Sequence, residues 1–528
     1  HMLQKTAKFI SYHSKIILLI ALLLLVPSAI GSLATRVNYD ILSYLPQDLD
    51  SSIGMGYLED VFQNAATNML IVDGMPLSYT EDLKNKIEKI DGIKSVTWID
   101  DFLDISFPQE MIPEKVKNMF YSQKGNSTMM VIQYKNAGAS DETRAAIDKI
   151  YSVCNKQCFL AGVSVVTDDI AKLVEHEVPI YVVLAVAMSF CAMFLVIDSW
   201  ALPFIYMAGI GIAVLYNLGT NIFLGEISYI TKAIAAVLQL GVSMDYSVFL
   251  VNRYKEERLS CPDKRDAMAN AITAAFTALF GSSFTTVAGF LALCAMRLTL
   301  GRDIGIVMAK GVILGIVTVV LVLPAIVLIF DKAIAKYHHR VFIPNLGKIS
   351  DLTVNKSKAF TLLFLVLFIP AAIMQGKVAM YYDLVEALPE NMPSIIANKK
   401  MAEEYNMATT QFIVISDSVP AASLEEMEKK IENTPGVSNL VAYNNILGST
   451  IPDEFVPDKI KEVCKAGGKQ MIMVNGTYDT ATDEANNQVN VITDIIKAYD
   501  KDAVITGQSP MTKDLIETAS MDFKITNY

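Results

Sequence analysis

Residues 227–252 read ISYITKAIAAVLQLGVSMDYSVFLVN, and this stretch decides the class of protein. It is long enough to cross a bilayer, because the hydrocarbon core needs about 20 mostly apolar residues in a helix. The run contains a carboxylate, Asp245, which precedes Arg253 by about 12 Å along a helix that rises about 1.5 Å per residue. We therefore predict a membrane helix with an ionisable side chain inside the hydrocarbon region.

Six other apolar segments of the chain are long enough to span a membrane. They cover approximately residues 16–33, 179–197, 202–219, 268–296, 303–330 and 359–376. The composition agrees, since 52% of the residues are hydrophobic, 19% are charged and the mean hydropathy is +0.38, whereas soluble domains average about 25% charged residues. The fold class predicted is an α-helical membrane bundle with two polar α+β domains between its spans.

The loops between the spans predict the orientation of the chain. Lys and Arg gather in the loop 253–266 and in the linker 332–358, and positively charged loops face the cytoplasm. Both polar blocks then lie outside the cytoplasmic membrane. In chain order we expect a first span (1–35), an external porter-like domain (36–178), spans two to six (179–333), a cytoplasmic linker (334–358), a seventh span (359–376) and a second external domain (377–528).

The chain repeats itself at an offset of about 343–345 residues. Residues 39–46, YDILSYLP, match residues 382–389, YDLVEALP, and residues 113–117, PEKVK, match residues 457–461, PDKIK. Strands and helices alternate in each polar block, which predicts two ferredoxin-like domains of split βαβ order related by a two-fold internal repeat. If the repeat continues, the whole protein has twelve spans and this chain lacks the last five.

Composition and motifs exclude several functions. The net charge of −11 comes with no basic stripe, so nucleic acid is not an expected partner. The chain has no phosphate-binding loop, nucleophile–base pair or metal-ligand spacing, so we expect neither an enzyme nor a cofactor. Cys154 and Cys158 could form a small external disulfide or remain two thiols.

Asp245 is the residue that we expect to couple the protein to protons. A carboxylate at this depth costs at least ~2.5–3.5 kcal/mol on insertion scales. Because hydrocarbon disfavours the ionised form, such a group can load and release a proton. Tyr246 supplies an adjacent hydroxyl that could donate to the carboxylate. A structural polar contact and a Na⁺ site are the alternatives for Asp245.

Small and polar residues of the spans suggest supporting roles. Gly241, Gly311 and Gly315 would let neighbouring helices approach closely. A cluster of hydroxyls in the next span could support a proton path or join helices: Ser282, Ser283, Thr285 and Thr286. We expect Lys310 to extend its amine towards the nearer membrane surface. In the polar blocks, Met129, Met130, Met471 and Met473 favour ordinary core packing over a soft lining for lipid.

The Asp-Tyr helix resembles a known family. Residues 241–250, GVSMDYSVFL, followed by Arg253, Glu256 and Glu257, are similar to the fourth helix of the MmpL branch of the resistance-nodulation-division (RND) superfamily. The order of helices and polar blocks along the whole chain resembles that superfamily too. The resemblance implies proton-driven export of lipids or other hydrophobic molecules across or from the cytoplasmic membrane. Asp245 and Tyr246 would be half of a relay whose other Asp-Tyr pair lies on a tenth helix. Ser243 replaces the usual glycine.

The partners implied are a lipid or other hydrophobic small molecule, protons and membrane lipids, and the protein could act as a monomer or as a homo-oligomer such as a trimer. Two other functions share this order of helices. One is a sterol-sensing, Patched-like lipid receptor, and the other is an assistant of protein translocation like SecDF. The SecDF alternative is weaker, because its fourth helix usually carries a different acidic motif.

Overall fold

The computed structural model describes residues 2–64, 66–102, 105, 108–112, 114–342, 347–375, 377, 388–447 and 458–527. These residues form two compact units. The first unit comprises His1–Val37, His176–Cys294 and Asp303–Tyr381, and the second comprises Asn38–Glu175, Ala295–Arg302 and Tyr382–Tyr528. Within the described residues, seven helices are long and apolar enough to cross a membrane, which confirms the predicted number of spans.

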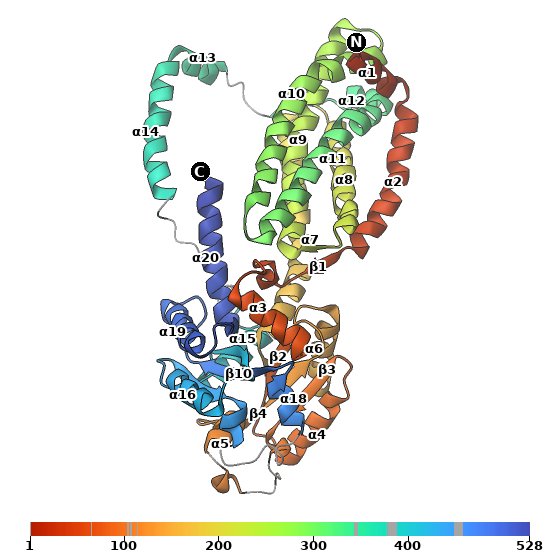
Figure 1. Ribbon diagram of the computed structural model, residues 1–528. Coiled ribbons are helices and arrows are strands. Elements are labelled where there is room, and N and C mark those ends of the chain that lie inside the picture. Colours follow the sequence, from red (N-terminus) through yellow and green to blue (C-terminus); the bar gives the residue numbers. More distant parts are fainter. Residues whose placement is uncertain are drawn as a thin grey trace. The chain divides into compact units, whose positions relative to one another are not determined.

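Except for its last helix, residues 357–375, which has no buried residues, the first unit is a bundle of helices (Figure 1). Its elements are α1 (Met2–Tyr12), α2 (Ser14–Ala34), most of α7 (Val163–Val196), α8 (Ala201–Gly219), α9 (Tyr229–Ser260), α10 (Lys264–Ala292), most of α11 (Thr299–Ile329), α12 (Asp331–Lys336), α13 (Gly347–Asn355) and α14 (Ser357–Gln375). Helix α2 packs on α8, α8 on α9, and α9 on α10. A short 3₁₀ turn, η5 (Thr220–Leu224), and strand β6 (Glu226–Ser228) connect α8 to α9. Strand β6 pairs with β1 (Arg36–Asn38).

Local capping explains where the helices of the bundle begin. The Ser228 side chain accepts a hydrogen bond from the Thr231 amide at the start of α9. The Asp263 carboxylate accepts one from the Arg265 amide at the start of α10. Each cap satisfies a backbone donor that has no partner within its helix. The apolar faces of these helices then bury a shared core that includes Leu250.

Helix α7 starts earlier than the predicted second span. We expected the second span to begin at about residue 179, but strand β5 (Cys158–Ala161) ends early, and α7 begins at Val163 and runs for 34 residues. The positive φ of Gly162, 130°, makes the turn between them. Ion pairing supports the polar first turns of the helix, since Lys172 pairs with Asp168 four residues earlier. The second span is therefore the apolar end of a longer helix.

The second unit contains two antiparallel sheets, each with two helices from the same half of the chain on one face. The first sheet consists of β2 (Ala66–Asp73), β3 (Ile93–Thr97), β4 (Ser127–Tyr134) and β5, in the order β3-β4-β2-β5. Helices α4 (Leu77–Glu88) and α6 (Asp141–Val153) follow β2 and β4 in the chain. In the register, Leu70 lies opposite Met130, and both side chains are fully buried in one apolar core.

The second sheet consists of β7 (Thr409–Ser416), β8 (Val437–Val441), β10 (Lys469–Gly476) and β11 (Val504–Gly507), in the order β11-β7-β10-β8. Strand β9 (Lys465–Ala466) pairs with β10. Helices α16 (Ala421–Glu432) and α19 (Asp483–Tyr499) follow β7 and β10. If β9 is set aside, each sheet has four strands, of which the first and third in chain order lie at the centre and the second and fourth at the edges.

Each sheet also buries its other face against a segment from the other half of the chain. Helix α15 (Pro393–Tyr405) packs on the first sheet, where Met401 joins Met129 in a core cluster. Helix α3 (Asp50–Gly56) and the π-helical turn η2 (Tyr57–Val61) pack on the second sheet, where Leu58 joins Met471. Because each sheet is covered by a segment from the other half of the chain, the two sheets form one unit.

The remaining described elements of the second unit are short, apart from the long helix α20. They are η1 (Ile41–Tyr44), η3 (Ile99–Asp101), η4 (Gln109–Met111), α5 (Glu114–Phe120), α17 (Tyr443–Leu447), α18 (Asp458–Cys464) and α20 (Gln508–Asn527). A further 3₁₀ turn, η6 (Leu293–Ala295), follows α10. Most of the second copy of the repeated motif, residues 382–387, lies outside the described residues.

Candidate functional site

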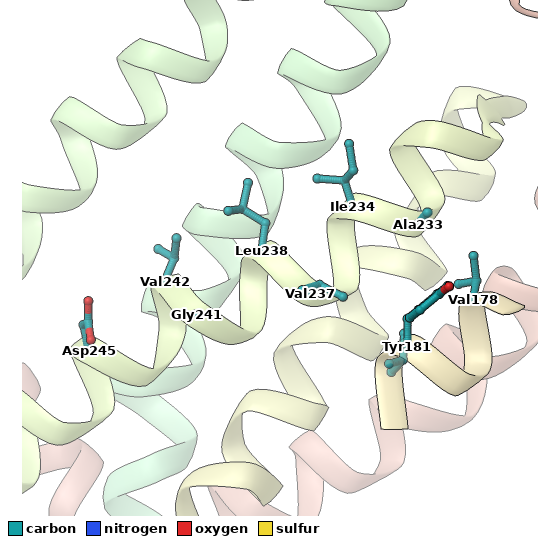
Figure 2. A pocket seen from close by; sticks show the side chains of 10 residues that line it. Val178, Tyr181, Ala233, Ile234, Val237, Leu238, Gly241, Val242 and Asp245 are labelled. Carbon is teal, nitrogen blue, oxygen red and sulfur yellow. The ribbon is translucent and has the colours of Figure 1, made fainter. Parts of the chain in front are cut away.

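An open groove of about 600 Å³ lies between α7 and α9 in the first unit. Figure 2 shows the α9 side chains in a row, with Asp245 at one end and the α7 residues Val178 and Tyr181 near the other. Its lining is Val178, Tyr181, Val182, Ala233, Ile234, Val237, Leu238, Gly241, Val242 and Asp245. Asp245 is the acidic residue of this lining, so the groove combines a hydrocarbon-like wall with one carboxylate.

Asp245 belongs to the outward-facing stripe of α9. It follows Ile234, Leu238 and Gly241 at helical spacing, and it is exposed among the described residues of the protein. We had expected the carboxylate to lie among the helices, but it lines the open groove. The carboxylate therefore lies on the same face of α9 as the apolar side chains of the groove.

Tyr246 lies on a different face of α9, turned away from the groove and into the bundle core. Successive residues of a helix with 3.6 residues per turn are about 100° apart. The Tyr246 side chain is 6% exposed and packs in the bundle core beside Leu250. Among the described contacts, no hydrogen bond joins it to Asp245, so the expected donation between the two neighbours does not occur in this structure.

The hydroxyl cluster of α10 is directed towards its own helix. Ser283 donates to the backbone oxygen of Leu279 at 2.8 Å. Thr285 and Thr286 donate to the backbone oxygen of Ser282 at 2.7 and 3.0 Å. Ser282 itself is exposed. None of the described hydrogen bonds joins these side chains to Asp245, and their support of a proton path stays a prediction.

The three glycines of the spans differ in their surroundings. A Cβ atom on Gly241 would meet nothing within 4 Å, because this glycine faces the groove. A Cβ on Gly311 would lie 2.6 Å from Asn217 Nδ2, and one on Gly315 would lie 2.7 Å from Ser243 Oγ. Close helix approach is therefore seen for Gly311 and Gly315 of α11, and the serine that replaces the usual glycine in α9 is accommodated by Gly315.

A polar network that we did not predict fills the inner side of α8, α9 and α11. Asn217 Nδ2 donates to Gln239 Oε1 at 3.1 Å, and Gln239 Nε2 donates to the backbone oxygen of Gly311 at 3.0 Å. Lys310 also belongs to it, since its amine donates to one oxygen of α8 and two of the following turn η5 rather than only extending to a surface. The sequence signal for this network was the presence of two amide side chains, Asn217 and Gln239, within otherwise apolar spans.

The second unit contains a chain of three cavities between its sheets. A polar one of about 230 Å³ is lined by Asn118 and Asn406 among others. It shares Asn439 with a smaller apolar one, which shares Phe102 with a cavity of about 80 Å³. This last cavity has a mostly apolar lining: Thr67, Thr97, Asp101, Phe102, Met119, Val131, Gln133, Phe412, Val441, Val463, Cys464, Met471 and Met473.

Of the four methionines noted in the sequence, two are buried in apolar cores and two line a cavity. Met129 and Met130 are buried in apolar cores on opposite faces of the first sheet. Met471 and Met473, two residues apart on β10, line the 80 Å³ cavity. Flexible thioether side chains adapt to ligands of irregular shape, so this wall suits a hydrophobic molecule.

Cys154 and Cys158 are free thiols that flank the turn from α6 to β5. A hydrogen bond from the Cys154 thiol lowers the pKa of Cys158 to about 7, against the opposing effect of burial. Burial raises the pKa of Cys464 to about 11. Within the residues that the structure describes, no group of three or more His, Cys, Asp or Glu side chains could hold a metal ion.

Known proteins resemble this chain along much of its length. A family model described as the MMPL family matches residues 43–342, which include the Asp245 groove. The chain belongs to the MMPL family. Together with its seven apolar helices, this membership makes it a multi-pass membrane protein of the RND/MmpL type.

Individual relatives of the family cover different parts of the chain. The putative membrane protein ActII-3 of Streptomyces coelicolor is 35% identical over 137 residues, which are 25% of this chain and 19% of that protein. The putative membrane protein YdgH of Bacillus subtilis is 21% identical over 407 residues, 72% of this chain and 43% of that protein. The apo-petrobactin exporter of Bacillus anthracis is 22% identical over 372 residues, 61% of this chain and 49% of that protein. The matches thus span less than half the length of each relative.

Proposed function

We propose that this MMPL protein exports lipids or other hydrophobic molecules from the cytoplasmic membrane and that protonation of Asp245 drives the export. The observation that carries the proposal is the single acidic side chain of the apolar groove between α7 and α9. An ionised carboxylate facing hydrocarbon costs at least ~2.5–3.5 kcal/mol. Protonation removes most of this cost, so the charge of Asp245 can determine which surface α9 presents to its surroundings.

Relatives with transport-related names support the export direction. One is named as an exporter of apo-petrobactin, and another is named as a probable transport protein, MmpL12 of Mycobacterium tuberculosis. The cavities between the sheets of the second unit suit the cargo, because a smaller apolar cavity connects their apolar wall of Phe412, Met471 and Met473 to a polar pocket. We assign the cargo to this wall and the proton to the groove.

We also propose that the two sheets are ferredoxin-like domains that arose by duplication and lie outside the cell membrane. The equal order of strands along both halves supports the duplication, as does the exchange of α3 and α15 between the sheets. The positively charged loops of the sequence support the external location.

The test replaces Asp245 by Asn in the chromosomal gene, because Asn has the shape of the acid but cannot carry the proton. Asp351→Asn is the matched control, since Asp351 is exposed on α13, outside the groove. Lipids at the cell surface are measured by mass spectrometry with and without a protonophore. We expect Asp245→Asn to reproduce the lipid profile of the deletion strain at an unchanged amount of membrane protein, and the control to match the wild type. Normal export by Asp245→Asn would refute the proposal.

A second measurement tests the proton site without knowledge of the cargo. A hydrophobic carbodiimide modifies protonated carboxyls in apolar surroundings, and mass spectrometry locates the modified residue. We expect labelling of Asp245 in membranes and a decline of that labelling as the pH rises, because the ionised carboxylate does not react. Absence of labelling at low pH would contradict an accessible proton site in the groove.

A further inference from the structure

Two charged residues of α11 lie at the connection between α8 and α9. Asp303 and Lys310 are seven residues apart, about two turns of helix, so they share one face of α11 at a separation of about 10.5 Å along its axis. Both belong to the first unit, as do the helix ends that they contact. Neither takes part in the groove around Asp245.

Lys310 contacts the carboxyl-terminal end of α8. Its amine donates to the backbone oxygen of Asn217 at 2.8 Å, to Thr220 Oγ1 at 2.8 Å and to Asn221 Oδ1 at 2.6 Å. An ammonium group has three donors, and all three are used. The last carbonyls of a helix carry partial negative charge, so the cation is placed where the end of α8 favours it.

Asp303 makes the complementary contact with the amino-terminal end of α9. Its Oδ2 atom accepts a hydrogen bond from the Ser228 amide at 2.8 Å and another from Thr231 Oγ1 at 2.5 Å. Ser228 is the N-cap of α9. The first amides of a helix carry partial positive charge, so the anion is placed where the start of α9 favours it.

Next to Lys310, α11 also packs closely on both neighbours. Gly311 admits the amides of Asn217 and Gln239, and Gly315 admits the hydroxyl of Ser243. The charged contacts and the glycine contacts lie along one continuous helix of 31 residues. A movement of α11 that keeps these contacts must carry the end of α8 and the start of α9 with it.

We propose that Asp303 and Lys310 are positioning residues which lock α11 to α8 and α9, so that α9 and its Asp245 carboxylate move as one body with α11. The role of Asp245 in this proposal rests on the proposed function. The locking of the three helices is independent of it.

The test measures hydrogen–deuterium exchange of the purified protein in two windows, residues 216–224 at the end of α8 and in η5, and residues 228–236 at the start of α9. Lys310→Met removes the charge and its three hydrogen bonds, and Lys310→Arg keeps the charge. Lys232→Met is the matched control, because Lys232 is an exposed lysine on the first turn of α9. If Lys310→Met does not fold, Lys310→Gln takes its place, since Gln removes the charge but keeps a polar side chain.

We expect Lys310→Met to raise exchange about tenfold in both windows, although Lys310 contacts only the first. Lys310→Arg should restore much of the protection, and Asp303→Leu should also loosen both windows. Faster exchange in residues 216–224 alone would mean that Lys310 merely caps α8, and it would overturn the proposal. Unchanged exchange in both windows would overturn it as well.

Carbodiimide labelling of Asp245 in the same variants tests the link to the proton site. We expect Lys310→Met to change the labelling rate by about three- to tenfold, with recovery in Lys310→Arg and no change in Lys232→Met. An unchanged rate alongside loosened windows would overturn the positioning role. If Asp245 of the wild type takes no label, the proposed function fails, and the exchange measurement still decides whether the helices are locked.

Discussion

The contact of Gly311 with Asn217 gives the sharpest prediction about the bundle. In Gly311→Ala the new Cβ atom would lie 2.6 Å from Asn217 Nδ2, whereas ordinary contacts begin at about 3.4 Å, so the amide must retreat by about 0.8 Å. Asn217 is fully buried and holds Gln239 by a hydrogen bond. Overpacking of this kind costs about 1–3 kcal/mol, because neither amide can move without weakening that bond.

Gly241→Ala is the matched control, since a Cβ at Gly241 meets nothing within 4 Å. Both variants gain up to about 1 kcal/mol from the better helix propensity of Ala, so their difference isolates the clash. Thermal unfolding of the detergent-solubilised protein should place Gly311→Ala below Gly241→Ala by roughly 2–4 °C for each kcal/mol. Asn217→Ala should reduce the cost of Gly311→Ala, with a coupling of about 0.5–3 kcal/mol. Equal stability of the two glycine variants would refute the packing argument.

Two further predictions concern the second unit. Met473→Trp should fill the 80 Å³ cavity and lower binding of a fluorescent fatty acid at least about tenfold. The control Met111→Trp, at an exposed position, should bind the fatty acid like the wild type. Equal binding by the two variants would show that the cavity is not part of the cargo route. Because the pKa of Cys158 is lowered to about 7 and the thiolate is the reactive form, its alkylation by N-ethylmaleimide should be half-maximal near pH 7 and level off about one pH unit higher. Cys154, whose pKa is raised, and the buried Cys464 should react more slowly in the folded protein, and mass spectrometry of the labelled peptides would reveal a reversed order.

The spans could be predicted because their signal is a property of long windows. Twenty apolar residues define a membrane helix whatever its neighbours are, and all seven expected segments have counterparts in the structure. The early start of α7 could not be predicted in this way. Residues 163–178 are rich in charge, and their helix is supported by ion pairs such as Lys172–Asp168 and Arg144–Asp168, the second of which joins residues 24 positions apart.

The details of the site depend on which way each helix face points, and one sequence does not contain that information. Gly241 and Gly315 are alike as residues, yet one faces an open groove and the other a serine of the next helix. Asp245 and Tyr246 are adjacent in sequence, and adjacency suggested a shared role. Because neighbours on a helix are about 100° apart, the Asp245 carboxylate lies in the groove and the Tyr246 phenol lies in the core.

The two faces of α9 limit how a proton on Asp245 could act. The groove face carries Asp245 among apolar side chains, while the inner face carries Gln239 and Ser243, which contact α8 and α11. In the described part of the chain, no hydrogen-bonded path runs from the carboxylate to the inner polar network. A change of charge in the groove must therefore reach the rest of the bundle through movement of α9 as a body. Under the proposed function, the close contacts of Gly311 and Gly315 would transmit this movement, because loose packing there would let α9 shift without its neighbours.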